Sequence, residues 1–157
     1  MWWDAGAVGA GVKEDEGWVR TRMARLFTFS GALLMQVGPF KEGWVDLEKA
    51  VEQDAECVRA RELKCVVGFK ALKFDAVLQD VAWFKERAAA PTKYFVGAFL
   101  AASMACFMKA RVVEGHEYAA LAFETSSRFG DYPGPDPKMF VMAKETQVIF
   151  ANKKGGL

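Results

Sequence analysis

Apolar residues recur at helical spacing along most of the chain, beginning at residue 16. Between residues 16 and 37 the steps are three and four residues, which places the apolar positions on one side of a helix. The positions expected to be buried on this helix are Val19, Met23, Leu26, Phe27, Leu34 and Val37, with the small Ser30 between them. Gly38 and Pro39 predict a helix end and a new start, because glycine favours the left-handed cap conformation and proline suits a first helical turn.

Two more helices are predicted between residues 40 and 73. The first covers residues 40–54, and its period buries Trp44, Leu47 and Val51 while the charged residues stay in water. The second covers residues 57–73. Residues 53–56 contain no strong helix breaker, so the two segments could also form one longer helix.

The central part of the chain is expected to contain a helix that has no polar face. Asp75 is a suitable N-cap for a fourth helix, which keeps its period until Pro91. The fifth helix, residues 93–112, is apolar nearly all round. Such a helix belongs in the centre of a fold, and its small residues, among them Ala102, allow neighbouring backbones to come close.

The last third of the chain mixes a helix with irregular structure. A sixth helix is predicted after a turn at Glu114 and Gly115. Residues 131–137 contain three prolines, which exclude a helix or a central strand and predict a rigid connector. Residues 138–145 could form a short seventh helix, whereas residues 146–151 favour a strand and precede a polar tail.

These elements predict one all-α domain of about three stacked helical hairpins, with six to seven helices in total. A chain of 157 residues is long enough for one core. Residues 1–13 are rich in glycine and alanine and predict a flexible leader. Residues 14–130 form the helical-hairpin domain, and residues 131–157 form the connector, the short helix and an irregular C-terminal tail.

An internal repeat supports the hairpin interpretation. Ala50, Ala82 and Ala122 occupy similar settings on the second, fourth and sixth predicted helices, at steps of 32 and 40 residues. These steps bracket the period of about 34 residues of helix-turn-helix repeats, whose paired helices bury a shared core only when they are stacked.

The first unit resembles a tetratricopeptide repeat, and the later units resemble pentatricopeptide repeats. The positions that match the former are Phe27, Gly31, Leu34, Gly38, Phe40, Leu47 and Ala50, with Gly43 where that family prefers alanine. Residues 118–123 match the second helix of a pentatricopeptide repeat, and Pro135 with Asp136 matches the pair that opens a following repeat. The resemblance covers residues 24–140 and implies stacked hairpins that bind a macromolecule.

A three-repeat chain of 17.4 kDa also resembles the extra subunit that euglenozoan mitochondrial ATP synthases carry on the α subunit of their catalytic head. This resemblance rests on size, repeat type and the lack of a catalytic site. It implies a pentatricopeptide-like, non-catalytic accessory subunit in the mitochondrion, with the α subunit as its partner. Residues 1–4 show no targeting signal.

Charge and hydropathy limit the other partners. The chain has 21 basic and 20 acidic residues, a net charge of +1, so no nucleic-acid partner is expected. An organellar RNA-binding protein remains the alternative, because pentatricopeptide proteins usually read single-stranded RNA. The longest uncharged run, residues 94–108, is shorter than the ~20 residues that cross a bilayer, so no transmembrane span is expected.

No set of residues predicts an active site, a cofactor or a metal. His116 is the single histidine and is expected to cap a helix at the surface. Cys57, Cys65 and Cys106 lack the spacing of a metal or redox site. We therefore expect neither an enzyme nor a bound cofactor.

The remaining expectation concerns partner contacts. Trp18, Trp44 and Trp83 fit helical faces and are expected in the core. Trp2 and Trp3 have no periodic partner, and the apolar run near the C-terminus needs a surface to cover it. The residues expected to contact a partner are Trp2, Trp3, Tyr132, Val148, Ile149 and Phe150. The predicted function is a non-catalytic protein-binding subunit of the mitochondrial ATP synthase or of another mitochondrial assembly.

Overall fold

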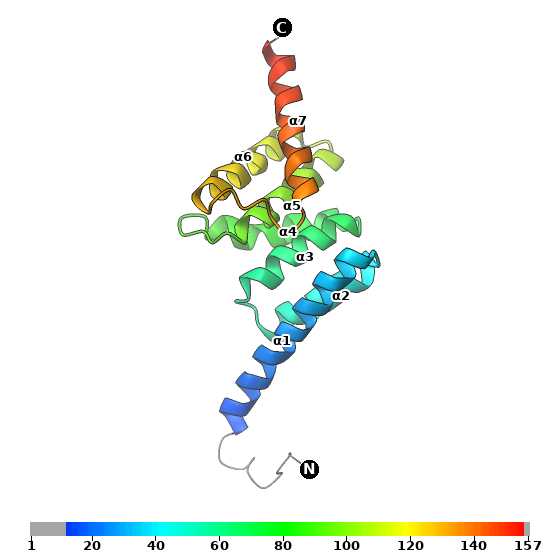
Figure 1. The fold of residues 1–157 in the computed structure, drawn as a ribbon, viewed down its shortest axis with the longest axis vertical. Coiled ribbons are helices and arrows are strands. Elements are labelled where there is room, and N and C mark those ends of the chain that lie inside the picture. The colour runs from blue at the N-terminus through cyan, green and yellow to red at the C-terminus, as the bar shows by residue number, and fades with distance from the viewer. Residues whose placement is uncertain (1–11, 156–157) are drawn as a thin grey trace.

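A computed structural model describes residues 12–155 of the protein, and within that range it contains helices and no strand. The helices are α1 (Val12–Val37), α2 (Phe40–Gln53), α3 (Val58–Lys70), α4 (Phe74–Glu86), α5 (Phe95–Met108), α6 (Val112–Arg128) and α7 (Pro137–Gly155), as Figure 1 shows. The predicted all-α class is confirmed. The chain does turn between α2 and α3, where the Glu56 N–H donates a hydrogen bond to Asp54 Oδ1 at 3.1 Å.

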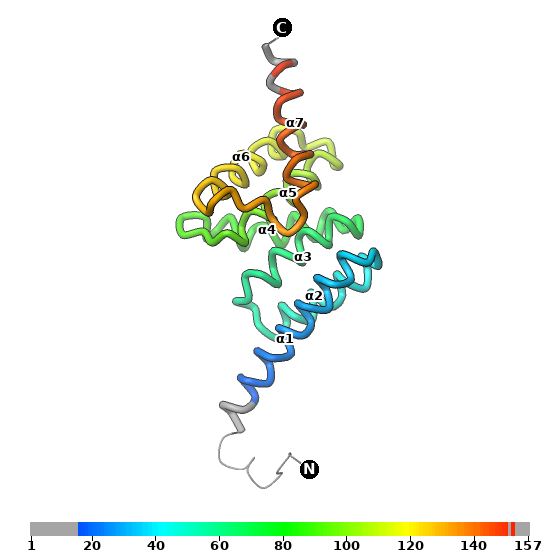
Figure 2. Tube along the Cα trace, viewed as in Figure 1, coloured from blue at the N-terminus to red at the C-terminus, as the bar shows by residue number. Residues whose placement is uncertain are grey.

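The helices form three hairpins, α1 with α2, α3 with α4 and α5 with α6, followed by α7. The odd-numbered helices contact one another in order, α1 with α3, α3 with α5 and α5 with α7. Each even-numbered helix contacts only its two neighbours along the chain. The trace in Figure 2 shows the result, an elongated stack with α1 at one end and α7 at the other. Each end helix therefore has a side on which no further helix packs.

The core is centred on α5, as predicted. All twelve residues from Phe95 to Cys106 are buried, Ala102 among them. The helix contacts α3, α4, α6 and α7, so residues 95–106 have no side left for water. Within the described range, no helix combines the length and the apolar character that crossing a membrane requires.

Two predicted helix starts are wrong, and tertiary packing explains both. Asp75 lies in the first turn of α4 and not at its N-cap, and its carboxylate pairs with Lys109 at 2.6 Å. The turn before α6 is at residues 109–111 and not at Gly115, which lies inside the helix. Gly115 is needed there because an added Cβ would come 2.5 Å from the ring of Phe107.

His116 consequently does not cap α6. It lies in the second turn of that helix, half-buried, with its ring 5.0 Å from the ring of Phe107 and 3.9 Å from that of Phe150. The expectation of a surface capping histidine is wrong, because the helix starts four residues earlier and turns this side chain towards α7.

The strand-prone residues 146–151 lie within α7. Their helix is anchored by Met139 and Ala143, which are buried on the side that faces the stack. The next turns continue the contact, since Gln147 Nε2 donates to the His116 carbonyl at 3.2 Å. Packing against α5 and α6 thus outweighs the local strand preference, and these residues are helical and not in the strand that their side chains favour.

Candidate protein-docking surface

Helix α1 packs on α2 through small residues. Its buried positions are Ala24, Thr28, Gly31 and Met35, which recur at steps of four, three and four and so share one face. At Gly31 a Cβ would lie 2.5 Å from Leu47 Cγ, so only glycine allows α2 this close. Near Gly31 this distance leaves no room for a large side chain, and most of the large side chains of α1 are exposed instead.

The opposite face of α1 is lined with large apolar side chains that water reaches. These residues are Trp18, Val19, Met23, Leu26, Phe29, Leu33 and Val37, and we call them the α1 outer face. Leu26 is 63% exposed and Phe29 is 65% exposed. At 3.6 residues per turn the seven positions fall within a sector of roughly 140°. They therefore share one side of the helix.

This arrangement overturns the burial predicted for α1. Trp18 was expected in the core and is 58% exposed, and Val19, Met23, Leu26 and Val37 are also exposed. The cause is the place of α1 at the end of the stack, where it has neighbours on one side only. Its turns over residues 16–23 are exposed on every side. Trp44 and Trp83, in contrast, are partly buried and pack against the core.

From residue 17 onward the charged residues of α1 are all basic, whereas its first turns contain the acidic residues 14–16. Residues 17–40 contain three arginines and no Asp, Glu or Lys. Arg20, Arg22 and Arg25 are exposed, and none of them makes a salt bridge within the part of the chain that the structure describes. The Arg22 guanidinium lies 4.3 Å from the centre of the Trp18 ring. The surface is thus apolar and cationic at once.

A second apolar surface lies at the other end of the stack. Its residues are Val141, Met142, Val148 and Ile149, which we call the α7 outer face. Each of them is about half exposed, whereas Met139 and Ala143 on the other side of α7 are buried. Figure 1 shows α1 and α7 at opposite ends of the molecule, so one flat partner does not cover both surfaces.

The structure separates the residues that sequence reasoning assigned to partner binding. Val148 and Ile149 are exposed on α7, at 59% and 58%. Phe150 instead packs its ring on His116, and the Tyr132 hydroxyl donates a hydrogen bond to Glu62 Oε1 at 3.2 Å. The two remaining residues, Trp2 and Trp3, lie outside the described residues. A partner contact at these positions stays a prediction.

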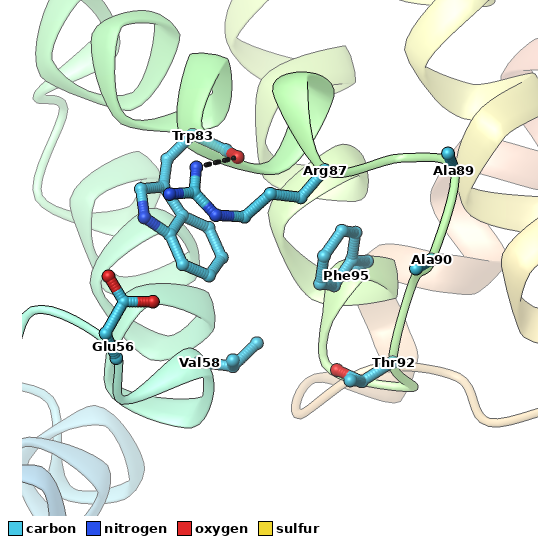
Figure 3. Close-up of a pocket in the computed structure, with 8 residues that line it drawn as sticks. All are labelled: Glu56, Val58, Trp83, Arg87, Ala89, Ala90, Thr92 and Phe95. Atoms are coloured by element: carbon cyan, nitrogen blue, oxygen red, sulfur yellow. Dashed lines mark hydrogen bonds between the residues drawn. The ribbon is translucent and has the colours of Figure 1, made fainter.

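A shallow pocket beside α3 and α4 is one concave candidate for a small ligand (Figure 3). Its volume is about 310 Å³, at the small end of ligand sites. The Arg87 guanidinium lies 4.1 Å from the centre of the Trp83 ring and donates to the Trp83 carbonyl at 3.1 Å. Arg61 stacks on the same ring at 4.7 Å. The cations are therefore already engaged by the protein, and the pocket supplies no converging set of polar groups.

Two observations in the described range bear on metal and thiol chemistry. No three His, Cys, Asp or Glu side chains come together there in a way that would hold a metal ion. Burial raises the pKa of the Cys65 and Cys106 thiols, which lowers their reactivity because the thiolate is the nucleophile.

Comparison with known proteins finds no relative of the chain. No protein-family model matches the sequence, and neither a curated protein nor a solved structure matches it significantly. Fold and surface alone define the class. The chain is an all-α protein of stacked helical hairpins whose two end helices expose apolar faces.

Proposed function

We propose that the chain is a non-catalytic subunit that binds another protein through the α1 outer face. The observation that carries this proposal is the row of seven large apolar side chains on an end helix. Contiguous apolar patches of this kind are rare on free soluble proteins and mark interaction sites. Stacked-helix proteins that stand alone usually close their ends with polar faces, and α1 does the opposite.

The composition of the surface also fits an interface. Trp, Phe, Met and Arg are enriched where proteins bind one another, and all four occur on or beside the α1 outer face, as Trp18, Phe29, Met23 and Arg22. Residues 16–23 are exposed on every side, and a short helix without packing is only marginally stable in water. A partner at this end would stabilise the first turns of α1.

We further propose that the larger complex is the mitochondrial ATP synthase, with the chain on the α subunit of its catalytic head. The support is the resemblance in size, in pentatricopeptide-like repeats and in the lack of catalytic groups. Another mitochondrial assembly is the alternative within the same class. Both place the chain among accessory subunits and assign it no reaction of its own.

The test compares two substitutions in the full chain, expressed in its source and purified under mild conditions. Leu26→Glu places a charge at the centre of the α1 outer face. Val113→Glu is the matched control, because Val113 is a similarly exposed aliphatic residue, at 69%, on α6. We expect the control to co-purify with the complex and Leu26→Glu to be lost from it, with mass spectrometry identifying the other subunits.

The outcomes separate the two levels of the proposal. A complex without ATP synthase subunits would refute the finer assignment and leave the docking role intact. If the wild-type chain purifies alone, or if Leu26→Glu is retained at normal yield, the α1 outer face is not the docking surface.

A further inference from the structure

We infer that the partner presents an acidic amphipathic α-helix, which packs lengthwise along the α1 outer face. This inference rests on the proposed function and names the chemistry of the partner. Three observations carry it: the spacing of the apolar residues, the unpaired arginines among them and the position of one arginine within the apolar sector.

The spacing matches the surface that a helix offers to another helix. Val19, Leu26 and Leu33 are separated by seven residues each, and Phe29 lies three residues after Leu26. Such a seven-residue repeat is typical of helices that pack side by side over a long contact. Residues 18–37 span about 29 Å at 1.5 Å per residue, so a partner helix of similar length could follow the whole surface.

The charge specifies what flanks the apolar seam of the partner. Arg20, Arg22 and Arg25 have no carboxylate partner among the described residues, and no acidic residue occurs between residues 17 and 40. Charges beside an apolar seam select the partner by attraction and repulsion. A partner helix with Asp or Glu beside its apolar residues would pair these guanidinium groups, and a lysine-rich helix would be repelled.

The same observations disfavour two other occupants. A second copy of the chain would bring the same three arginines against these, with acidic residues only in the first turns of α1, at positions 14–16. A helix that lies on a lipid surface keeps its cations on the side away from the acyl chains. Arg22 instead lies four residues from both Trp18 and Leu26, in the middle of the apolar sector, where it stacks on the Trp18 ring. A carboxylate on a protein helix can reach that position from the side.

The experiment uses the full chain and two synthetic peptides with the same heptad seam of leucines. One peptide has glutamate and the other lysine at the positions beside the seam. We expect fluorescence anisotropy to show at least about tenfold tighter binding of the glutamate peptide, with an affinity that falls as salt is added. Leu26→Glu should abolish binding, and Val113→Glu should leave it unchanged. The double variant Arg22→Glu, Arg25→Glu should reverse the preference between the peptides.

Four results would overturn the inference. Equal binding of both peptides would show that charge does not select the partner. If neither peptide binds, the partner is not an amphipathic helix. Binding of the chain to phosphatidylcholine and phosphatidylglycerol vesicles that Leu26→Glu abolishes would identify a lipid surface. Dimerisation that the same substitution abolishes would identify a second copy. Each of these results leaves the docking role open to its own co-purification test, which does not depend on peptide charge.

Discussion

The Tyr132 hydroxyl donates a hydrogen bond to Glu62 Oε1 over 3.2 Å and so ties the connector after α6 to α3. The second oxygen of the same carboxylate, Oε2, accepts the Gly97 N–H in the first turn of α5 at 3.1 Å. No side chain next to α5 caps this helix, so Glu62 supplies the missing acceptor from a distance. Because Glu62 is only 1% exposed, one buried carboxyl group holds three elements together.

The first prediction concerns pH. Burial raises the pKa of Glu62 from 4.5 to about 8, so between these values the folded chain keeps a proton that the unfolded chain releases. The contribution of this group to stability is therefore fully present below pH 4.5 and is lost as pH rises through about 8, by an amount on the order of 5 kcal/mol. Urea denaturation across this window should show the loss in the wild type and a flatter profile for Glu62→Gln. Parallel profiles would show that Glu62 does not titrate in this range.

The second prediction is that Tyr132→Phe destabilises the fold. The substitution keeps the ring and leaves Glu62 Oε1 without its donor in a buried site, which costs roughly 1–3 kcal/mol. The matched control is Tyr94→Phe, whose ring packs against that of Tyr132 and which should change little. The free energy of unfolding in urea measures both. Equal effects of the two substitutions would argue that the hydrogen bond contributes nothing to stability.

The third prediction tests the close approach of the connector to α5. A Cβ at Gly97 would lie 2.7 Å from both Glu62 Cγ and Pro135 Cδ. Gly97→Ala should therefore lower stability by roughly 1–3 kcal/mol, although alanine favours a helix more than glycine does. Gly17→Ala is the control, because nothing lies within 4 Å of an added Cβ there, and it should keep or raise the melting temperature. The idea fails if both variants melt alike.

Helix periodicity predicted most of the helices but not which face of α1 is buried. Along α5 the distinction does not arise, because every side is apolar and all of residues 95–106 are buried. In α1 two faces compete, one with large apolar residues and one with Ala24, Thr28 and Gly31. Close packing against α2 selects the small residues, since a Cβ at Gly31 would meet Leu47.

The α1 outer face was therefore missed, although the sequence contains signals for it. Residues 17–40 carry arginines and no acid, which is unusual for a helix that faces only its own core. The small residues at steps of four and three also indicate a closely packed face, and the large residues must then point elsewhere. What the sequence alone does not supply is the number of neighbours that α1 has, because that depends on its place at the end of the stack.

The fourth prediction distinguishes protein docking from RNA binding. The net charge is +1, and the three arginines of α1 release too few counterions for strong binding of a polyanion. We expect no submicromolar affinity for single-stranded oligoribonucleotides near physiological salt, measured by filter binding or anisotropy. A salt-sensitive submicromolar affinity that Arg22→Glu abolishes would favour RNA, with Trp18 and Phe29 as stacking surfaces.

The fifth prediction concerns three neighbouring residues of α7 that the structure assigns to different roles. Val148 and Ile149 are exposed, so their joint replacement by glutamate should leave the melting temperature unchanged. Phe150 packs its ring 3.9 Å from that of His116, and aromatic pairs contribute about 1 kcal/mol beyond the area they bury. Phe150→Ala should therefore lower the melting temperature, which differential scanning calorimetry detects.

Association is the second measurement on the same variants, because a stability effect alone does not identify a binding residue. If Val148 and Ile149 contact a partner, as expected from the sequence, their double glutamate variant should lose co-purification while it melts normally. Phe150→Ala should keep its partner as long as it remains folded, since its ring faces α6. Retention of the partner by the double variant would leave the α1 outer face as the docking end, and it would mean that the α7 outer face plays no part in assembly.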